Sequence, residues 1–301
     1  MLYKNLSGYL REKYGRRLKK ICIDAGFSCP NRDGKISTGG CIFCGERGAG
    51  EHIDAKASIR EQVLSVLDFA SEGEEFIAYF QNFTNTYADI DTLKSRYDAA
   101  LISDRIKVLA IGTRPDCIND EIAALLASYK EKRDVWVELG LQTANDETAK
   151  RINRGYPLSS FENALSILEK HGLKVVVHLI IGLPGETISD VMKTAEYISQ
   201  KNLFGVKIHS IYVMRGTRLE KEYLSGAYTP PTLDEYASGA AYVISRLSPE
   251  TVIHRLTGDC PDGLLVAPEW NKDKHGIIKK IEEKLLSEGK TQGSNFRGCR
   301  I

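Results

Sequence analysis

The chain has 301 residues, of which 42% are hydrophobic and 27% charged, and its formal net charge is +1. This composition is typical of a soluble globular protein with one large domain or two smaller ones. The longest strongly apolar stretch, residues 175–183, is too short to span a bilayer, and the basic N-terminus does not resemble a signal peptide, so we expect a cytoplasmic protein.

The first 20 residues concentrate positive charge. They hold seven Lys or Arg residues and one Glu, a local charge of +6, which leaves −5 for the other 281 residues. Such a segment is a candidate for binding phosphate groups. The alternative is a solvated, charge-rich segment without a partner. We define residues 1–19 as a basic N-terminal arm, and the candidate phosphate contacts are Lys13, Arg16, Arg17, Lys19 and Lys20.

After the arm, short β-branched runs alternate with longer segments of helical pattern. The predicted strands are Lys20–Asp24, Phe76–Phe80, Ile106–Ile111, Val135–Leu139, Val175–Ile181 and Val206–Tyr212. The predicted helices between them are Ser58–Ala70, Asp91–Leu101, Asn119–Lys130, Phe161–His171 and Ser189–Gln200. Six βα units in succession predict a parallel sheet with helical crossovers, either doubly wound or curved into a closed or partial barrel.

The alternation changes after residue 228. The remaining segment predicts a helix at Leu233–Arg246, a short strand at Val252–Arg255 and a final helix at Ile277–Ser287. We therefore expect a core over residues 20–228 and a C-terminal α/β extension over residues 229–301 that packs on the core.

Polar or ionisable residues stand in or directly after every predicted strand of the core. They comprise the cysteine loop after the first strand, the segments 81–85, 112–116, 138–143 and 182–186, and the sixth-strand residues Lys207, His209 and Tyr212. Sites of parallel βα proteins form where strands end and the following loops begin. We therefore expect one continuous active site at this rim.

The loop after the first strand carries Cys29, Cys41 and Cys44. One interpretation is a structural zinc site, with His52 or Cys22 as fourth ligand. A second is a redox pair of Cys41 and Cys44, which leaves Cys29 unexplained. The third is a [4Fe–4S] cluster, which normally takes four cysteines. With three, one iron keeps an open position for a small molecule, as S-adenosylmethionine (SAM) chemistry requires. We interpret the other thiols as packing residues: Cys22, Cys117, Cys260 and Cys299.

These motifs resemble a known group. A three-cysteine loop after the first strand of a six-fold βα chain is similar to the radical SAM superfamily, whose usual spacing is three residues and then two. The longer spacing here, with "CPNRDG" at 29–34 and "GGCIFC" at 39–44, resembles the YhcC/YtqA-like family, which is related to the radical SAM domain of the Elongator catalytic subunit. Further matching blocks are "YFQNFTNTY" at 79–87, "IGTRPDCI" at 111–118, "WVELGLQT" at 136–143, "INRGY" at 152–156, "VHLIIGLPGET" at 177–187 and "VIHRLTGD" at 252–259.

The resemblance implies a partial (β/α)6 TIM-like barrel of the radical SAM type. It also implies a [4Fe–4S] cluster on Cys29, Cys41 and Cys44, and reductive cleavage of SAM to methionine and a 5′-deoxyadenosyl radical. The SAM contacts that it implies are Gln81 and Asn82 for the amino group, Glu138 and Gln142 for the ribose and carboxylate, Ile181, Gly182 and Leu183 for the adenine, and Arg114 for orientation of SAM or substrate.

Some of these residues have structural alternatives. Glu138 could pair with Arg154 or Arg151, and Arg114 could simply brace its loop by pairing with Asp116. His178 and His209 are candidate substrate contacts, but strand alternation could equally bury either one in the barrel wall. His254 and Arg255 are candidates for closing the pocket.

The resemblance also implies an RNA substrate. The expected reaction is on the C5 side chain of the tRNA wobble uridine, from carboxymethylaminomethyl towards aminomethyl, with phosphate contacts from the basic arm and an electron donor such as flavodoxin or ferredoxin. About 70 residues follow residue 230, too few for an acetyltransferase domain beside the extension, so acetyl transfer is not expected. The alternatives are a radical SAM enzyme acting on a small molecule and a non-catalytic zinc or iron–sulfur RNA-binding protein.

Overall fold

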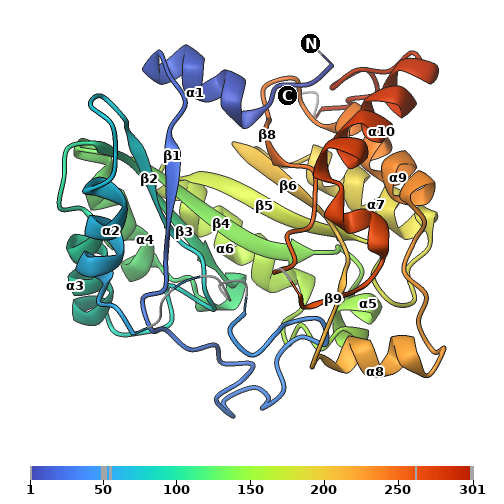
Figure 1. The fold of residues 1–301 in the computed structure, drawn as a ribbon, viewed down its shortest axis with the longest axis horizontal. Helices are drawn as coiled ribbons and strands as arrows, with labels where there is room; N and C mark the ends of the chain where they lie inside the picture. The colour runs from blue at the N-terminus through green and yellow to red at the C-terminus, as the bar shows by residue number, and fades with distance from the viewer. Residues whose placement is uncertain (1, 49–52, 54–55, 262, 299–301) are drawn as a thin grey trace.

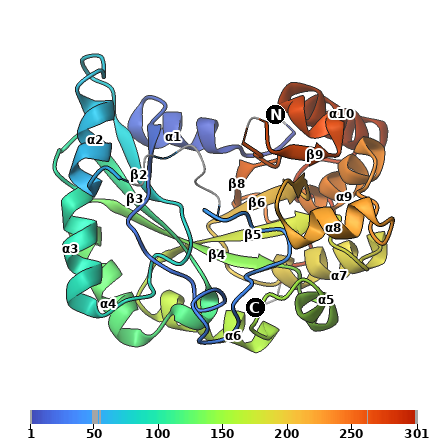
Figure 2. The ribbon, with the colours of Figure 1, turned by 60° about the horizontal axis from the view of Figure 1, so that its bottom comes forward.

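The computed structural model describes residues 2–48, 53, 56–261 and 263–298. Its main feature is a parallel seven-stranded sheet in the order β1-β2-β3-β4-β5-β6-β8, curled into a half-barrel (Figures 1 and 2). The strands are β1 (Lys19–Ile23), β2 (Phe76–Phe80), β3 (Ile106–Thr113), β4 (Asp134–Gln142), β5 (Lys174–Ile181), β6 (Gly205–Ser210) and β8 (Val252–Arg255). Because the order never reverses, the sheet has no doubly wound switch point, and the partial-barrel prediction is confirmed.

Most helices pack on the convex face of this sheet (Figure 2). They are α2 (Ile59–Leu67), α3 (Ile90–Ala100), α4 (Asp120–Ser128), α6 (Leu158–Lys170), α7 (Ile188–Ser199), α9 (Leu233–Arg246) and α10 (Lys274–Ser287), which packs on α9. The strands and helices expected from the sequence lie within a few residues of these bounds. The strand at 252–255 pairs with β6 and so becomes the seventh strand of the main sheet.

Several short elements are absent from the sequence-based expectation. They are α1 (Leu6–Tyr14), α5 (Asp146–Arg151), α8 (Arg218–Leu224), the antiparallel pair β7 (Val213–Met214) and β9 (Leu265–Ala267), and 3₁₀ turns at Pro115–Cys117, Tyr129–Glu131 and Glu269–Lys272. Their length explains the omission, because two to nine residues give little periodic signal. Among the described residues, no helix is long and apolar enough to cross a membrane.

Strand alternation divides the side chains of the sheet between two environments. Apolar side chains on the convex face, such as Ile21, Leu109 and Val177, form the main core with the helices. On the concave face, a second apolar cluster fills the end where the strands begin. It consists of Leu10, Leu18, Ile77, Tyr79, Val108, Ala110, Trp136 and Val176. The concave face at the opposite end is left for the cavity described below.

The N-terminal residues are part of the packed fold. Asn5 caps α1 by accepting a hydrogen bond from the backbone N–H of Gly8, and Leu10 is buried in the second apolar cluster. The backbone N–H of Ile253 donates to the carbonyl of Lys4 at 2.8 Å, which joins this segment to β8. In Figure 1, α1 lies at the end of the sheet opposite the loop after β1.

Some of the basic residues of this segment form ion pairs within the chain. Lys13 pairs with Asp134 and Lys19 with Glu74. Lys20 is directed into the barrel, where its ammonium lies 5.4 Å from the ring centroid of Tyr79. Exposed basic side chains remain at Arg16 and Arg17, but Arg16 donates to a backbone carbonyl. The alternative of a solvated segment therefore does not hold for the buried Leu10, and Lys20, a candidate phosphate contact, is directed to Tyr79 in the barrel.

Candidate functional site

The loop after β1 is held by hydrogen bonds. The backbone N–H of Arg32 donates to the carbonyl of Cys29 at 2.8 Å, and the Arg32 guanidinium donates to the carbonyls of Cys44 and Gly45. Gly40 has φ +65°, and a Cβ there would lie 2.9 Å from the Arg32 side chain. A glycine is thus required where the loop folds back on itself.

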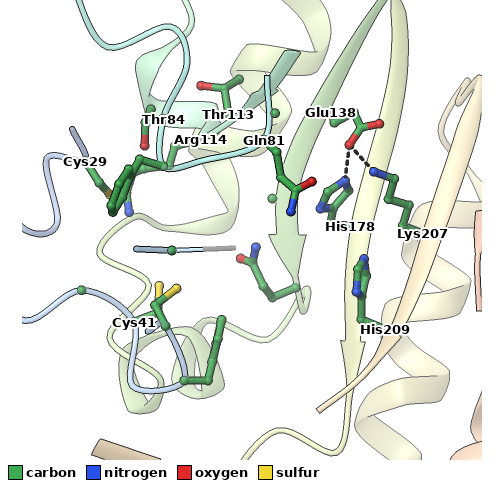
Figure 3. A pocket seen from close by; sticks show the side chains of 18 of the residues that line it. Cys29, Cys41, Gln81, Thr84, Thr113, Arg114, Glu138, His178, Lys207 and His209 are labelled. Carbon is green, nitrogen blue, oxygen red and sulfur yellow. Dashed lines mark hydrogen bonds and ion pairs between the residues drawn. The ribbon is translucent and has the colours of Figure 1, made fainter. Parts of the chain in front are cut away.

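The three cysteines of this loop line one cavity of about 260 Å³ at the carboxyl ends of the strands. Residues of β2, β3, β4, β5, β6 and β8, and of the loops that follow several of these strands, line the rest of it. Among them are Tyr79, Gln81, Thr84, Arg114, Glu138, Gln142, Tyr156, His178, Lys207, His209, Tyr212 and Arg255. In Figure 3, Cys29 and Cys41 lie on one side of this cavity, and Glu138, Lys207 and His209 on the other.

The thiols of the loop form no disulfide, and Cys41 and Cys44 are hydrogen-bonded to each other. The bond from Cys41 lowers the pKa of Cys44 to about 7, and Arg32 and Arg114 favour its thiolate further. The same bond and burial raise the pKa of Cys41. One of the two sulfurs is therefore favoured as a thiolate, the form that binds metals.

The donor set fits a cluster better than a single ion. Within the described ranges, no three His, Cys, Asp or Glu side chains are placed to hold one metal ion. A cubane binds each thiolate through a different iron, so its ligands need not converge on one point. Cys22 lies among the cations of the barrel interior, near Lys20 and Lys207, and His52 lies outside the described residues. The structure therefore does not bring Cys22 to the three cysteines as a fourth zinc ligand.

Glu138 is the centre of a buried polar network (Figure 3). Its Oε2 accepts hydrogen bonds from Lys207 Nζ and, at 2.9 Å, from His178 Nε2. Lys207 Nζ also lies 3.1 Å from the hydroxyl of Tyr79. Burial alone would raise the pKa of Glu138, but Lys207 and His178 hold it well below its usual value. Burial lowers the pKa of Lys207 to about 7 despite the adjacent carboxylate.

The structural alternative for Glu138 is wrong. Arg154 pairs with Asp146 at 3.2 Å, and Arg151 pairs with Glu222 at 2.6 Å. Alternation along β4 explains this outcome, because Glu138 faces the barrel interior, whereas Arg151 ends α5 and Arg154 lies in the loop after it.

The four histidine and arginine candidates on β5, β6 and β8 divide between the two ends of the barrel. His178 and His209 both line the cavity, with ring centroids 5.4 Å apart, and burial lowers the pKa of each. Arg255 also lines it. The expectation for His254 is wrong, because this ring packs 5.2 Å from Trp136 in the apolar end. A register shift between β6 and β8 accompanies this placement.

Among the expected SAM contacts, Gln81, Arg114, Glu138 and Gln142 line the cavity. Asn82 does not; it is buried, and its Nδ2 donates to Asp24 Oδ2 at 2.6 Å.

The last three expected SAM contacts also lie outside the cavity lining. Ile181 faces the convex core, and Leu183 packs in a separate cluster with Ile42 and Tyr228. Gly182 has φ +96° and closely approaches Pro231, while its carbonyl accepts from Tyr228. The structure gives these three residues a packing role.

Arg114 braces its own loop, as the alternative interpretation expects. It forms two hydrogen bonds with Asp116, at 3.0 and 2.8 Å, and a third with the carbonyl of Arg154 at 2.9 Å. Gln142 accepts from the hydroxyl of Tyr156 at 3.2 Å and has φ +60°. Phe83, also at the cavity, has φ +56°. Backbone strain of this kind at non-glycine residues is concentrated at functional sites.

Sequence reasoning gave no role to two cavity residues, Tyr79 and Tyr156, whereas it had already placed Thr84, Lys207 and Arg255 at the rim or the pocket. The hydroxyl of Thr84 is buried and has no hydrogen-bond partner within the described residues, so it is available to a ligand. Lys207 stands two residues before His209 on one strand and therefore on the same face, in agreement with its expected place at the rim.

The half-barrel and its three-cysteine cavity define a radical SAM protein, and the comparisons agree. The radical SAM superfamily model matches residues 33–198, and the radical SAM C-terminal domain model matches residues 204–287. The chain belongs to the radical SAM superfamily, whose cofactors are a [4Fe–4S] cluster and SAM.

Within the superfamily, the chain is similar to the protein YtqA of Bacillus subtilis (strain 168), at 35% identity over 98% of this chain and 93% of the relative. It is also 29% identical to the tRNA uridine(34) acetyltransferase of Dehalococcoides mccartyi (strain CBDB1), over 58% of this chain and 38% of that protein. The solved structure of Methanocaldococcus infernus Elp3 shares the fold, with a TM-score of 0.64 at 20% identity over 80% of this chain and 60% of that chain. The expected resemblance is confirmed.

Proposed function

We propose that this protein is a radical SAM enzyme that modifies the C5 side chain of the tRNA wobble uridine, from carboxymethylaminomethyl towards aminomethyl. The observation that carries the proposal is the similarity to a protein named as a tRNA uridine(34) acetyltransferase, combined with a cavity that holds three cysteines at one side and ionisable side chains at the other.

In this proposal, Cys29, Cys41 and Cys44 would hold the cluster, and an external donor such as flavodoxin or ferredoxin would supply its electron. When bound, the cluster supplies the electron for reductive cleavage of SAM to methionine and a 5′-deoxyadenosyl radical. Gln81, Arg114, Glu138 and Gln142 hold SAM between the cysteine loop and the buried network; of these, Glu138 accepts the ribose hydroxyls.

Replacement of each loop cysteine by alanine tests the cluster assignment. We expect Cys29→Ala, Cys41→Ala and Cys44→Ala to lose most of the bound iron and the visible absorbance of the anaerobically reconstituted protein. Cys117→Ala is the matched control and should keep both, because Cys117 lies outside the cavity lining. Retention of a full cluster by any of the three loop variants would contradict the ligand set.

Two cation–aromatic pairs offer contacts for a splayed nucleotide: Arg32 and Phe83 line the cavity, and Lys35 and Tyr87 line a separate pocket. The guanidinium of Arg32 lies 5.6 Å from the ring centroid of Phe83, and the ammonium of Lys35 lies 5.3 Å from that of Tyr87. Cations next to aromatic rings suit single-stranded RNA, which is bound by phosphate attraction and base stacking. These residues stand at the cysteine end of the barrel, whereas α1 stands at the other end (Figure 1).

Mass spectrometry of nucleosides from the total tRNA of a deletion strain tests the proposal. We expect carboxymethylaminomethyl-uridine to accumulate at the expense of aminomethyl and methylaminomethyl forms, and the wild-type gene to reverse the change. A C41A gene is the control and should not reverse it. An unchanged profile, in an organism that contains the later forms, would overturn the substrate and favour a small-molecule reaction.

A further inference from the structure

The cavity lining contains a surplus of positive charge. Of the described residues that line it, Glu138 is the only carboxylate, whereas four are cations: Arg32, Arg114, Lys207 and Arg255. Asp116 neutralises Arg114, and Arg32 is bound by backbone carbonyls of the cysteine loop. Arg32 keeps its charge but lies at the cysteine loop, so the two remaining cations, Lys207 and Arg255, stand together on the wall formed by β6 and β8.

That wall places its basic groups side by side. Lys207 and Arg255 are register partners on β6 and β8, and His178 is the partner of Lys207 on β5. His209 lies two residues beyond Lys207, and its Nε2 is buried without a hydrogen-bond partner among the described residues. Opposite this wall, Lys20 has no carboxylate within 4 Å in the part of the chain that the structure describes.

Neighbouring acids only partly offset this charge. Glu138 is shared by Lys207 and His178, and Asp259 lies 3.6 Å from the partly exposed Arg255. The cofactors do not remove the surplus either. Three thiolates leave an oxidised [4Fe–4S] cluster with one net negative charge, and SAM carries one net positive charge, so the two cancel. A wall with a buried ammonium, a partly exposed guanidinium and an unsatisfied imidazole nitrogen is complementary to an anionic group.

We propose that Lys207, Arg255 and His209 form a subsite for a carboxylate of the substrate. This inference rests on the proposed function, in which the substrate side chain ends in a carboxymethyl group. The Arg255 fork and the Lys207 ammonium provide charge-assisted hydrogen bonds, and His209 donates from Nε2. An aminomethyl product lacks the carboxylate and keeps its own positive charge, so the same subsite disfavours it. The wall thereby binds the substrate more tightly than the product.

Binding of two anticodon stem-loop RNAs to the reconstituted holoprotein tests this inference. One RNA carries carboxymethylaminomethyl-uridine at the wobble position and the other aminomethyl-uridine. We expect the wild type to prefer the first by roughly tenfold or more, because a charge-assisted contact is lost with the second. Arg255→Gln should reduce this preference towards unity, and Arg60→Gln, on the exposed face of α2, should keep it.

The outcomes separate the inference from the proposed function. Equal binding of both RNAs by the wild type, equal weakening of both by Arg255→Gln, or loss of SAM affinity in Arg255→Gln would each overturn the subsite. Binding of neither RNA would overturn the RNA substrate.

The subsite is then tested with N-methylglycine, which carries the same carboxymethylamino group, against methylamine. Imidazole NMR signals of His209 should shift only with N-methylglycine and less in Arg255→Gln; no shift would overturn the subsite.

Discussion

At the scale of single residues, the buried pair of Glu138 and Lys207 links stability to the site. Both side chains are 2% exposed. A buried carboxylate and ammonium stabilise each other, but the removal of one leaves the other uncompensated in a low-dielectric interior. Glu138→Gln keeps the shape of the side chain and removes its charge. We expect it to lower the free energy of unfolding by about 3 kcal/mol, measured by urea denaturation of the apoprotein.

A double-mutant cycle distinguishes this effect from simple loss of packing. Glu138→Gln combined with Lys207→Met should cost about 1 to 3 kcal/mol less than the sum of the two single variants. The exposed pair of Glu147 and Lys150 on α5 is the matched control, and Glu147→Gln should leave unfolding essentially unchanged. Additive single variants would show that the buried charges do not interact.

Glu186, in the loop after β5, gives a prediction about pH. Burial raises its pKa to about 7 from the ordinary value of 4.5, while the hydrogen bond from Thr143 opposes the rise. The folded state therefore binds this proton more tightly than the unfolded state. Its stabilising contribution is fully present below pH 4.5 and is lost as the pH rises through about 7.

Glu186→Gln mimics the protonated side chain and should remove this dependence. We expect the variant to exceed the wild type in unfolding free energy at pH 8 by about 1 to 2 kcal/mol, and to match it at pH 4. Urea denaturation at several pH values measures the difference. The exposed Glu121→Gln is the control and should run parallel to the wild type. A parallel profile for Glu186→Gln as well would mean that the folded protein leaves this carboxyl at its ordinary pKa.

Residue alternation explains which parts of the site could be predicted. Sequence spacing places the cysteine loop and the strand ends at one rim. The location of the three cysteines, Glu138 and the polar strand ends could therefore be predicted. The direction of Ile181 was also readable, since His178 and Ile181 differ by three positions on one strand and must face opposite sides. The placement of His254 was not readable, because it depends on an irregularity in pairing between β6 and β8.

At the scale of elements, α1 closes the end of the barrel opposite the cysteines. Sequence reasoning treated its nine residues as part of a charged arm because of Arg11 and Lys13. Its apolar face consists of the buried Leu10 and the partly buried Leu6, Tyr9 and Tyr14. These side chains are buried only when α1 packs against the sheet. Helix periodicity in so short a segment is therefore set by tertiary packing.

Leu10→Ala tests this role of α1. Leu10 is 3% exposed in the cluster that also contains Leu18 and Trp136. We expect the substitution to lower the free energy of unfolding by about 2 to 5 kcal/mol, since a buried leucine leaves a cavity when truncated. Arg11→Ala on the exposed face should change it little. Equal stability of Leu10→Ala and the wild type in urea denaturation would show that residues 1–19 are a free arm after all.

At the scale of the whole molecule, exposed basic side chains lie at both ends of the barrel, near α1 and near the cysteine loop. Arg16 and Arg17 stand near α1, whereas Lys35 and Arg215 are exposed beside the cysteine loop and β7. A wobble nucleotide that enters the cavity brings its flanking phosphates to the second end. Electrostatic attraction falls off within about 10 Å at moderate salt, so the first end contributes little to that encounter.

Two charge-neutralising double variants separate these ends. We expect Lys35→Gln with Arg215→Gln to weaken binding of the anticodon stem-loop and to reduce the slope of log affinity against log salt by roughly 1 to 2, one contact per removed charge. Arg16→Gln with Arg17→Gln removes the same charge at the other end and should leave the slope unchanged. If the slope fell only in the Arg16→Gln and Arg17→Gln variant, RNA binding would be assigned to the N-terminal segment. The slope measures how many counterions the protein's charges displace from the phosphates.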